Sequence, residues 1–274
     1  MPIKFRVFEE GELASQKITN NPLVKNKQVH SMNFYKTAWS VISRLTIKDE
    51  SPLVSALMVT RGEISFVKRA IKLFENQSWS NKELIIISVN KNEEIISAIE
   101  ESKCKIVFHL VPDGLTLGEL RNISISHANG DFLIMWDDDD LYHKDRILTM
   151  MNVLRESNAD LAFLSKLQLY WISKKKLALS HTRMWEGSVI MKRSASIIYP
   201  SLNKGEDTPV VTHQIKKHKI ALVNAPYLYT YCITGLNTHD KNHFENMFNQ
   251  GKIYSSLDAD NIKGKLNYFK YIKQ

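Results

Sequence analysis

Four consecutive aspartates are the most concentrated group of possible metal ligands in the sequence. Asp137, Asp138, Asp139 and Asp140 directly follow an apolar run, residues 132–136, that is typical of a strand buried on both faces. Their side chains are therefore expected at the carboxyl end of one strand, which is where open α/β sheets bind ligands. Because so many like charges repel each other, we expect a divalent cation and a phosphorylated substrate to neutralise them. The alternative is a solvated acidic turn that also caps the next helix.

The amino terminus of a predicted helix is a second candidate site for binding a charged ligand. Thr116 and Glu119 have the spacing of a capping box, which predicts a helix that begins at Thr116. Arg121 and Asn122 then fall within its first two turns. Backbone donors and the positive end of the helix dipole at such a position suit a bound anion. The alternative is that Arg121 is an ordinary surface residue of the helix.

An acidic pair, Glu206 and Asp207, follows Gly205 and opens another predicted helix. Taken alone, the pair is typical of an acidic helix start, which the helix dipole stabilises. It gains a chemical interpretation only in combination with the other motifs.

A parallel sheet is expected to position these groups. Apolar runs of strand length occur at residues 54–60, 84–89 and 105–111, and a helical repeat of apolar residues follows the first of them. Strand, helix and strand at these separations predict a right-handed crossover. We therefore predict an α/β fold with a mixed, mostly parallel central sheet flanked by helices. Further strands are expected at residues 161–164, 167–171, 220–224 and 227–233, and an amphipathic helix over residues 147–154.

The chain divides into three predicted parts. Residues 1–50 form a leading segment with one helix, residues 51–235 the main domain, and residues 236–274 a helical C-terminal extension. Aromatic residues and lysines near the C-terminus either lie on a lipid surface or, as is more common, pack against the protein itself. The helix of the first part is predicted from apolar residues at helical spacing, namely Phe34, Ala38, Val41, Ile42 and Leu45.

The composition favours anionic molecules as partners. The formal charge of +8 suits nucleotide diphosphates, lipid phosphates or acidic glycans. Nucleic acid is not expected, because the lysines are scattered and no basic stripe is interleaved with aromatic residues. Cys104 and Cys232 are far apart, which argues against a disulfide framework or a zinc site and fits a reducing cytoplasm. No apolar run reaches membrane-spanning length, so we expect a cytoplasmic protein with at most peripheral contact at the inner face of a membrane.

Four motifs occur in this order: a strand that ends in Thr60-Arg61-Gly62, a helix with Gly118, Arg121 and Asn122, the stretch GDFLIMWDDDDLYHKDRI, and Gly205-Glu206-Asp207. Together they resemble the family 2 glycosyltransferases, which have the Rossmann-like nucleotide-diphosphosugar transferase fold. The resemblance covers residues 52–235. It implies a metal-dependent, inverting transfer of a sugar from a nucleoside diphosphate to a hydroxyl of a glycan or lipid-linked saccharide, in bacterial surface polysaccharide synthesis.

The resemblance also implies roles for the acidic residues. Asp137 and Asp139 form the family's Asp-x-Asp pair. Asp139 is then the direct ligand of Mn²⁺ or Mg²⁺, and Asp137 lies nearer the ribose or a metal-bound water. Hard carboxylate oxygens suit these ions, which stabilise the charge on a leaving diphosphate. Asp207 becomes the general base that takes a proton from the acceptor hydroxyl, and Glu206 positions either Asp207 or the acceptor.

Other residues match the family's substrate-binding segments. Trp185 is either a stacking platform for a sugar ring or an ordinary core residue. His239 and His243 stand where some relatives place a late residue on the metal or diphosphate, so His243 is a further candidate metal ligand. The implied donor side comprises Thr60, Arg61, Glu63, Asn90, Arg121, Asp137 and Asp138, and the implied acceptor side comprises Trp185, Glu186 and Gly187.

One departure from the family concerns the nucleotide base. The family commonly has adjacent aspartates after the second strand, whereas this chain has Ser88-Val89-Asn90. The amide of Asn90 offers both a donor and an acceptor to a base. The identity of the base is therefore open.

Two other functions are also open. A nucleotidyltransferase on a similar sheet needs clustered carboxylates and a metal, but Thr60-Arg61-Gly62-Glu63 is a poor version of its glycine-rich first loop. A sugar- or nucleotide-binding module without catalysis would keep the fold and lose turnover.

Overall fold

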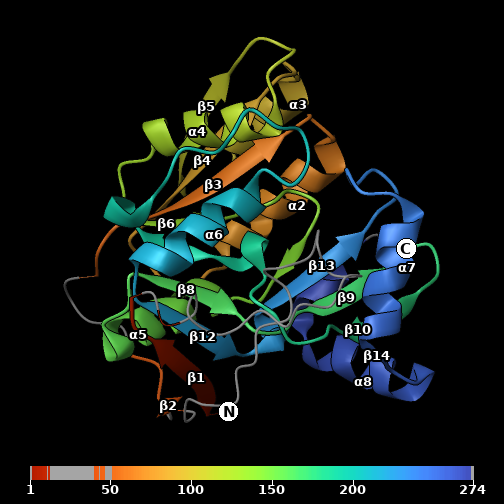
Figure 1. Ribbon diagram of the computed structural model, residues 1–274. Coiled ribbons are helices and arrows are strands. Elements are labelled where there is room, and N and C mark those ends of the chain that lie inside the picture. The colour runs from red at the N-terminus through yellow and green to blue at the C-terminus, as the bar shows by residue number, and fades with distance from the viewer. Residues whose placement is uncertain (1, 11, 13–39, 43, 47–50, 273–274) are drawn as a thin grey trace.

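Two β-sheets carry the chain, and helices cover the larger one (Figure 1). The structure is a computed structural model that describes residues 2–10, 12, 40–42, 44–46 and 51–272. From one edge to the other, the large sheet contains β2 (Ser40–Ile42), β1 (Ile3–Phe8), β12 (Ile220–Asn224), β8 (Leu161–Leu164), β11 (Ile190–Lys192), β6 (Phe132–Met135), β3 (Val54–Thr60), β4 (Lys82–Ser88) and β5 (Lys105–Leu110). The small sheet contains β14 (Lys252–Ile253), β10 (Lys176–Leu179), β9 (Gln168–Trp171), β13 (Tyr229–Ile233) and β7 (Leu141–Tyr142).

Seven α-helices are seen in the described residues. They are α2 (Ile64–Glu75), α3 (Glu93–Glu100), α4 (Leu117–His127), α5 (Arg146–Ser157), α6 (Asp207–Lys217), α7 (Lys241–Gln250) and α8 (Ser256–Lys265). A short 3-10 turn, η2 (Glu186–Ser188), precedes β11.

Successive residues of β3 point to opposite faces of the large sheet, and both faces are buried. Ala56 and Met58 belong to the core that α2 and α5 close, whereas Leu57 belongs to the core under α4 and α6. β3 pairs in parallel with both β4 and β6, so the carboxyl ends of these three strands meet at one edge. β11 runs antiparallel to β6 and β8, which makes the sheet mixed. The predicted α/β fold with a mixed sheet flanked by helices is confirmed.

The first fifty residues contribute strands to the large sheet. β1 pairs antiparallel with β12 and with β2. The predicted helix is therefore wrong where the structure describes it, because Val41 and Ile42 lie in β2, and such β-branched side chains suit a strand. Phe34 and Ala38 lie outside the described residues. The division of the chain at residues 50 and 235 stays a prediction.

The C-terminal segment packs on the small sheet through α7, β14 and α8. β14 pairs with β10. Tyr268 is buried, and its hydroxyl donates to the backbone oxygen of Tyr227 at 2.9 Å. This aromatic side chain therefore packs against the protein itself and is not available to a lipid surface. No helix in the described ranges is both long enough and apolar enough to cross a bilayer.

Candidate active site

The four aspartates after β6 do not have the same surroundings. Asp140 is fully buried, and its Oδ1 accepts from the backbone nitrogen of Cys232 at 2.7 Å while its Oδ2 accepts from the hydroxyl of Tyr229 at 2.5 Å. Burial raises the pKa of Asp140 to about 8, against the lowering effect of these two bonds. We call residues 137–140, which follow β6, the acidic strand end; Asp140 connects it to β13 of the small sheet.

Asp138 and Asp139 are half-buried and are each held by a side chain from another segment. Asp138 Oδ2 accepts from Thr60 Oγ1 at 2.5 Å, and Asp139 Oδ2 accepts from Asn237 Nδ2 at 2.7 Å. Burial raises the pKa of Asp138 to about 6. Burial and repulsion by the neighbouring aspartates raise the pKa of Asp139 well above its ordinary value. A bound cation would relieve this repulsion.

Arg121 joins the acidic strand end to the acidic start of α6. Its Nε donates to Glu206 Oε1 at 2.8 Å, and its Nη1 lies 3.5 Å from Asp137 Oδ1. Arg121 is 7 % exposed, so it is not the ordinary surface residue that the sequence left open. The aspartates and the Glu206-Asp207 pair therefore belong to one site.

The approach of α4 to the loop before α6 depends on a glycine. α4 begins with the predicted capping box, in which Thr116 Oγ1 accepts from the backbone nitrogen of Glu119 at 3.3 Å. A Cβ added at Gly118 would lie only 1.9 Å from the backbone oxygen of Pro200. The missing side chain lets the first turn of α4 contact this loop, which places Arg121 beside Glu206.

Asp207 is the first residue of α6 and lies among other charged groups. Burial and the nearby charge of Glu186 raise the pKa of Asp207 above its ordinary value, although two arginines oppose the rise. Glu186 is ion-paired with Arg183, and Glu206 is ion-paired with Arg121. Within the described residues, Asp207 has no arginine or lysine at ion-pair distance. Its carboxylate is therefore the member of this acidic group that is suited to accept a proton.

The loops after β3 and β4 form one wall next to the aspartates. The backbone nitrogen of Gly62 donates to Thr60 Oγ1 at 2.9 Å, and Asn90 Nδ2 donates to the backbone oxygen of Arg61 at 2.5 Å. One amide hydrogen of Asn90 is thus used to hold the first loop. The side chains of Arg61 and Glu63 are exposed on this loop.

The turn at residues 185–187 lies against the acidic strand end. A Cβ at Gly187 would lie 3.6 Å from Asp137 Oδ2. Trp185 is 6 % exposed and the Cζ of Arg183 lies 4.2 Å from the centroid of its ring, which agrees with a core residue better than with an open stacking platform. Trp185 Nε1 is buried without a hydrogen-bond partner in the described part of the chain.

His239 and His243 stack on each other with ring centroids 4.0 Å apart. Burial, together with the positive charges of His239, Arg183 and Lys204, lowers the pKa of His243 to about 4. Burial also lowers the pKa of His239, and the charge of Glu206 acts on this ring in the opposite direction. The pair therefore lies toward the Glu206 side of the site and is neutral at pH 7.

The carboxylates of the acidic strand end suit a hard divalent cation that is also bound by oxygen atoms of a substrate. Among the residues with described positions, no three His, Cys, Asp or Glu side chains converge to hold a metal ion by themselves. Mg²⁺ is usually bound by one or two carboxylates together with substrate phosphates and water, and it does not require a complete protein cage. Asp139 and Asp137 can supply those carboxylates.

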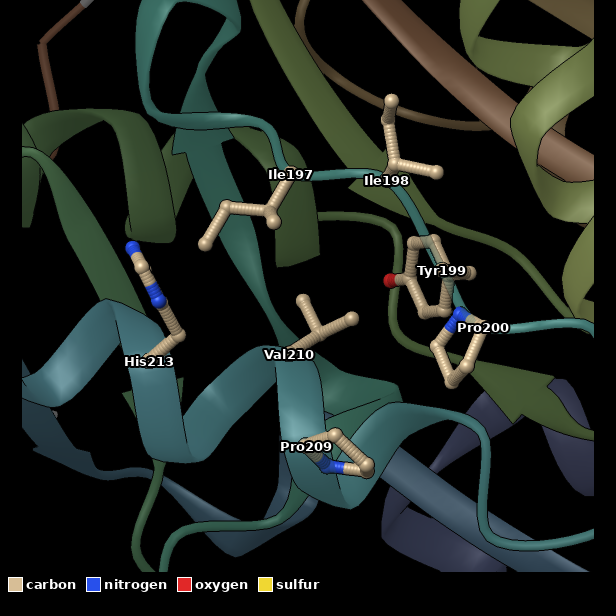
Figure 2. A pocket seen from close by; sticks show the side chains of 7 residues that line it. All are labelled: Ile197, Ile198, Tyr199, Pro200, Pro209, Val210 and His213. Atoms are coloured by element: carbon tan, nitrogen blue, oxygen red, sulfur yellow. The ribbon is translucent and has the colours of Figure 1, made fainter.

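An open apolar groove runs beside the start of α6 (Figure 2). Ile198 at this groove is 82 % exposed. Tyr199 connects the groove to the site, because the Cζ of Arg121 lies 5.9 Å from the centroid of its ring. The groove has a volume of about 280 Å³ and is lined by Ile197, Ile198, Tyr199, Pro200, Pro209, Val210 and His213.

Arg69 and Asn237 support Asp139 and were not predicted from the sequence. Arg69 Nη2 donates to the backbone oxygen of Asp139 at 2.7 Å, and Asn237 holds the side chain of the same aspartate. Arg69 lies in an amphipathic helix, and Asn237 lies in a polar loop. Neither position carries a local sequence signal, because both contacts join segments that are far apart in the chain.

The fold is that of an α/β protein, and its candidate site lies at the carboxyl ends of parallel strands, where such sheets usually bind ligands. The family model described as glycosyl transferase family 2 matches residues 55–221, and the chain belongs to this family.

Two relatives are described as uncharacterized glycosyltransferases. The one from Haemophilus influenzae is 24 % identical over 184 residues, which cover 64 % of this chain and 66 % of the relative. The one from Methanocaldococcus jannaschii is 29 % identical over 120 residues, which cover 42 % of this chain and 41 % of the relative. The matches thus span less than two thirds of the length of either relative.

Two solved structures share the fold at low sequence identity. S. aureus TarS in complex with UDP-GlcNAc has a TM-score of 0.57 and 12 % identity, and the alignment covers 79 % of this chain and 72 % of TarS. The mannosyltransferase PcManGT from Pyrobaculum calidifontis, in complex with GDP-Man and Mn²⁺, has a TM-score of 0.53 and 12 % identity. That alignment covers 72 % of this chain and 60 % of PcManGT.

Proposed function

We propose that the protein transfers a sugar, with inversion, from a nucleoside diphosphate to a hydroxyl of a glycan or lipid-linked saccharide. The observation that carries this proposal is the position of Arg121, which contacts both Asp137 and Glu206. This contact supports a single site in which the aspartates hold a cation and Asp207, next to Glu206, accepts a proton. Family membership, and the nucleotide sugars bound to TarS and PcManGT, support the donor class.

On the donor side, Asp139 and Asp137 would hold Mn²⁺ or Mg²⁺ together with the diphosphate. When bound, such an ion stabilises the negative charge that grows on the leaving diphosphate. The Mn²⁺ in the PcManGT complex supports this choice of ion. Thr60 fixes Asp138, and we assign the nucleoside to the wall formed by the loops at Thr60 and Asn90.

On the acceptor side, Asp207 takes the proton of the attacking hydroxyl. A carboxyl group whose pKa is raised is a better proton acceptor once it is ionised, which suits this role. The acceptor oxygen forms a bond to the anomeric carbon as the bond to the diphosphate oxygen breaks on the opposite face. Glu206, held by Arg121, keeps the start of α6 in place.

Of the two acceptor classes, the groove favours the lipid-linked saccharide. Its lining is apolar apart from His213 and the hydroxyl of Tyr199, and one of its lining residues, Pro209, follows Asp207 by two positions. A hydrocarbon chain attached to the acceptor would bury Ile198, which is otherwise exposed. A role in surface polysaccharide synthesis at the inner face of a membrane belongs to the same proposal.

A panel of nucleoside-diphosphate sugars incubated with the protein and Mn²⁺ tests the proposed function. Release of the nucleoside diphosphate, increased by an acceptor, is the expected result. Release of pyrophosphate from a nucleoside triphosphate and a sugar phosphate would instead identify a nucleotidyltransferase. Donor binding without turnover would identify a non-catalytic nucleotide-sugar-binding module.

A further inference from the structure

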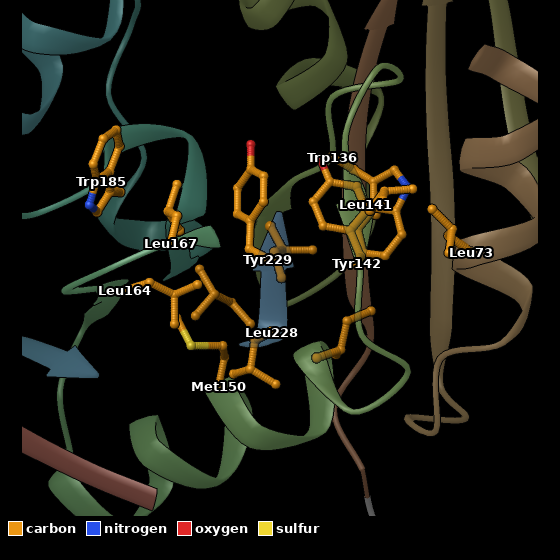
Figure 3. Packing of buried hydrophobic residues seen from close by; sticks show 14 of the residues in the cluster. Leu73, Trp136, Leu141, Tyr142, Met150, Leu164, Leu167, Trp185, Leu228 and Tyr229 are labelled. Atoms are coloured by element: carbon orange, nitrogen blue, oxygen red, sulfur yellow. The ribbon is translucent and has the colours of Figure 1, made fainter. Parts of the chain in front are cut away.

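A buried arginine behind the acidic strand end takes no part in the proposed chemistry. Arg146, the first residue of α5, is 0 % exposed. Its Cζ lies 4.4 Å from the ring centroid of Tyr142, 4.7 Å from that of Tyr229 and 5.4 Å from that of Trp136. We call these three rings the aromatic cage; Figure 3 shows them within the buried core. A full positive charge is therefore enclosed by aromatic faces.

The guanidinium of Arg146 is poorly supplied with hydrogen-bond acceptors. Nη2 makes a long hydrogen bond of 3.5 Å to the backbone oxygen of Gly187, whereas Nε and Nη1 have no partner in the described ranges. Burying a charge with unused donors costs folding free energy, and cation–π contacts offset that cost only in part. Stability alone gives no physical reason for an arginine at this position.

The aromatic cage connects Arg146 to both ends of the aspartate run. The hydroxyl of Tyr142 donates to the backbone oxygen of Asp137 at 3.0 Å, and the hydroxyl of Tyr229 donates to the carboxylate of Asp140. The two tyrosines are direct partners in the pairing of β7 with β13, with ring centroids 4.9 Å apart. Arg146 thus contacts the rings whose hydroxyl groups hold the first and the last of the four aspartates.

Arg146 also contacts the acceptor side of the site through Gly187. The backbone oxygen of Gly187 accepts its long hydrogen bond, and a Cβ added at Gly187 would lie 3.4 Å from the hydroxyl of Tyr229 and 3.6 Å from Asp137 Oδ2. One side chain therefore touches supports of both the donor side and the acceptor side.

We propose that Arg146 is a positioning residue for the transfer reaction. It clamps Tyr142, Tyr229 and Gly187 against one another, which fixes the direction in which Asp137 and Asp139 face the donor. This inference rests on the proposed function, because it gives the aspartates a cation and a nucleotide to hold.

Arg146→Met separates positioning from folding. Methionine fills a similar volume without a charge, so we expect an unchanged or higher thermal midpoint of unfolding. Calorimetric titration with UDP and with GDP, each with Mn²⁺, should show at least tenfold weaker binding, and kcat should fall with it. Arg146→Lys keeps a cation over the rings and should recover part of the binding. Arg155→Met on the same helix removes an exposed arginine that donates to Thr46 and Asn152; it is the matched control for nucleotide binding and for kcat, and it should change neither of them.

Two results would overturn the role of Arg146. One is wild-type binding and kcat in Arg146→Met; the other is a lower midpoint with unchanged binding per folded molecule, which would make Arg146 an ordinary structural residue. If the wild-type protein binds neither nucleotide, the proposed function fails separately. Titration with Mn²⁺ alone then decides the role of Arg146, because weaker Mn²⁺ binding in Arg146→Met supports it and equal or absent binding rejects it.

Discussion

The two acidic groups of the site are held in different ways. On the side that we assign to the donor, the acidic strand end receives hydrogen bonds from segments far apart in the chain, including Thr60 in the first loop and Asn237 after β13. On the side that we assign to the general base, Asp207 begins α6, and the contact that reaches across the site is the ion pair between Arg121 and Glu206. The donor side is therefore more extensively fixed than the base side.

This difference predicts that substitutions can impair donor binding and sugar transfer separately. In the proposed reaction, a densely bonded acidic group would be preorganised to hold the cation and the diphosphate, which would lower the cost of reorganisation. Asp207 has a raised pKa and is not tied to an arginine in the described residues, so its carboxylate can accept a proton. Changes at the aspartates after β6 should remove donor binding, whereas a change at Asp207 should remove transfer alone.

Asp207→Asn should have the largest effect on the rate. Loss of a general base should lower kcat for transfer by about 10²- to 10⁴-fold, while calorimetry shows unchanged affinity for the nucleoside diphosphate with Mn²⁺. Asp131→Asn, at an exposed aspartate before β6, is the control and should keep the normal rate. A normal rate in Asp207→Asn would exclude Asp207 as the base.

Asp139→Asn should remove the metal dependence of donor binding. An amide is a weaker ligand for a hard cation, so affinity in the presence of Mn²⁺ should fall by at least about tenfold, to the value measured with a chelator. The titration is run with and without Mn²⁺ on the wild-type protein and on Asp139→Asn. Binding that still increases with Mn²⁺ in the variant would mean that the ion is held elsewhere.

Gly118→Ala should weaken both the fold and the link between the two sides. The new Cβ would overlap the backbone oxygen of Pro200, and such overpacking costs about 1–3 kcal/mol of the free energy of unfolding. Gly264→Ala in α8 is a matched control, since nothing lies within 4 Å of its added Cβ, and it should be neutral or slightly stabilising. Urea unfolding compares the two, and equal stability would show that the loop before α6 yields easily.

Ile198→Ser should affect only acceptors that carry an apolar chain. Removing this exposed side chain from the groove should raise KM a few-fold for an acceptor with a long alkyl group and leave KM unchanged for the same sugar without it. Leu257→Ser is the control, because Leu257 is 73 % exposed on α8, away from the groove. Equal KM values for the long-chain acceptor in the wild type, Ile198→Ser and Leu257→Ser would show that the groove has no role in acceptor binding.

The pH dependence of stability should reflect Asp140. Burial raises its folded-state pKa to about 8, above the ordinary value of 3.8, so the unfolded chain loses this proton first as the pH rises. Because the folded state keeps this proton and the unfolded chain does not, the free energy of unfolding falls progressively until the pH passes about 8. The four histidines with lowered pKa values take up protons on unfolding near their ordinary pKa of 6.5, so the effect of Asp140 is measured above about pH 7.5, where the thermal midpoint should still fall until the pH passes about 8. Asp140→Asn should flatten this slope, and an unchanged slope would reject the assignment.

The sequence predicted the strands with the clearest local signal. Residues 54–60, 161–164 and 220–224 were predicted with the bounds that the structure gives, because they are continuous apolar runs buried on both faces. β1 and β2 were not predicted. A short strand that completes the edge of a sheet depends on its partner and leaves little local pattern.

The candidate site shows the same limit. The aspartates stand out in the sequence because they are consecutive and follow an apolar run, and Glu206-Asp207 was selected only by motif order. Arg69 and Arg146 were missed because each contacts this region from a helix whose sequence pattern is that of an ordinary amphipathic helix. Sequence patterns report local periodicity, whereas these contacts depend on tertiary packing.

A crystal structure with Mn²⁺ and a nucleoside diphosphate tests most directly whether the two acidic groups serve one reaction. The expected result is the ion on Asp139 and the diphosphate between the acidic strand end and α6, with the carboxylate of Asp207 facing the open side where the sugar would lie. A nucleotide bound elsewhere, or a diphosphate that Asp207 does not face, would contradict the proposed transfer.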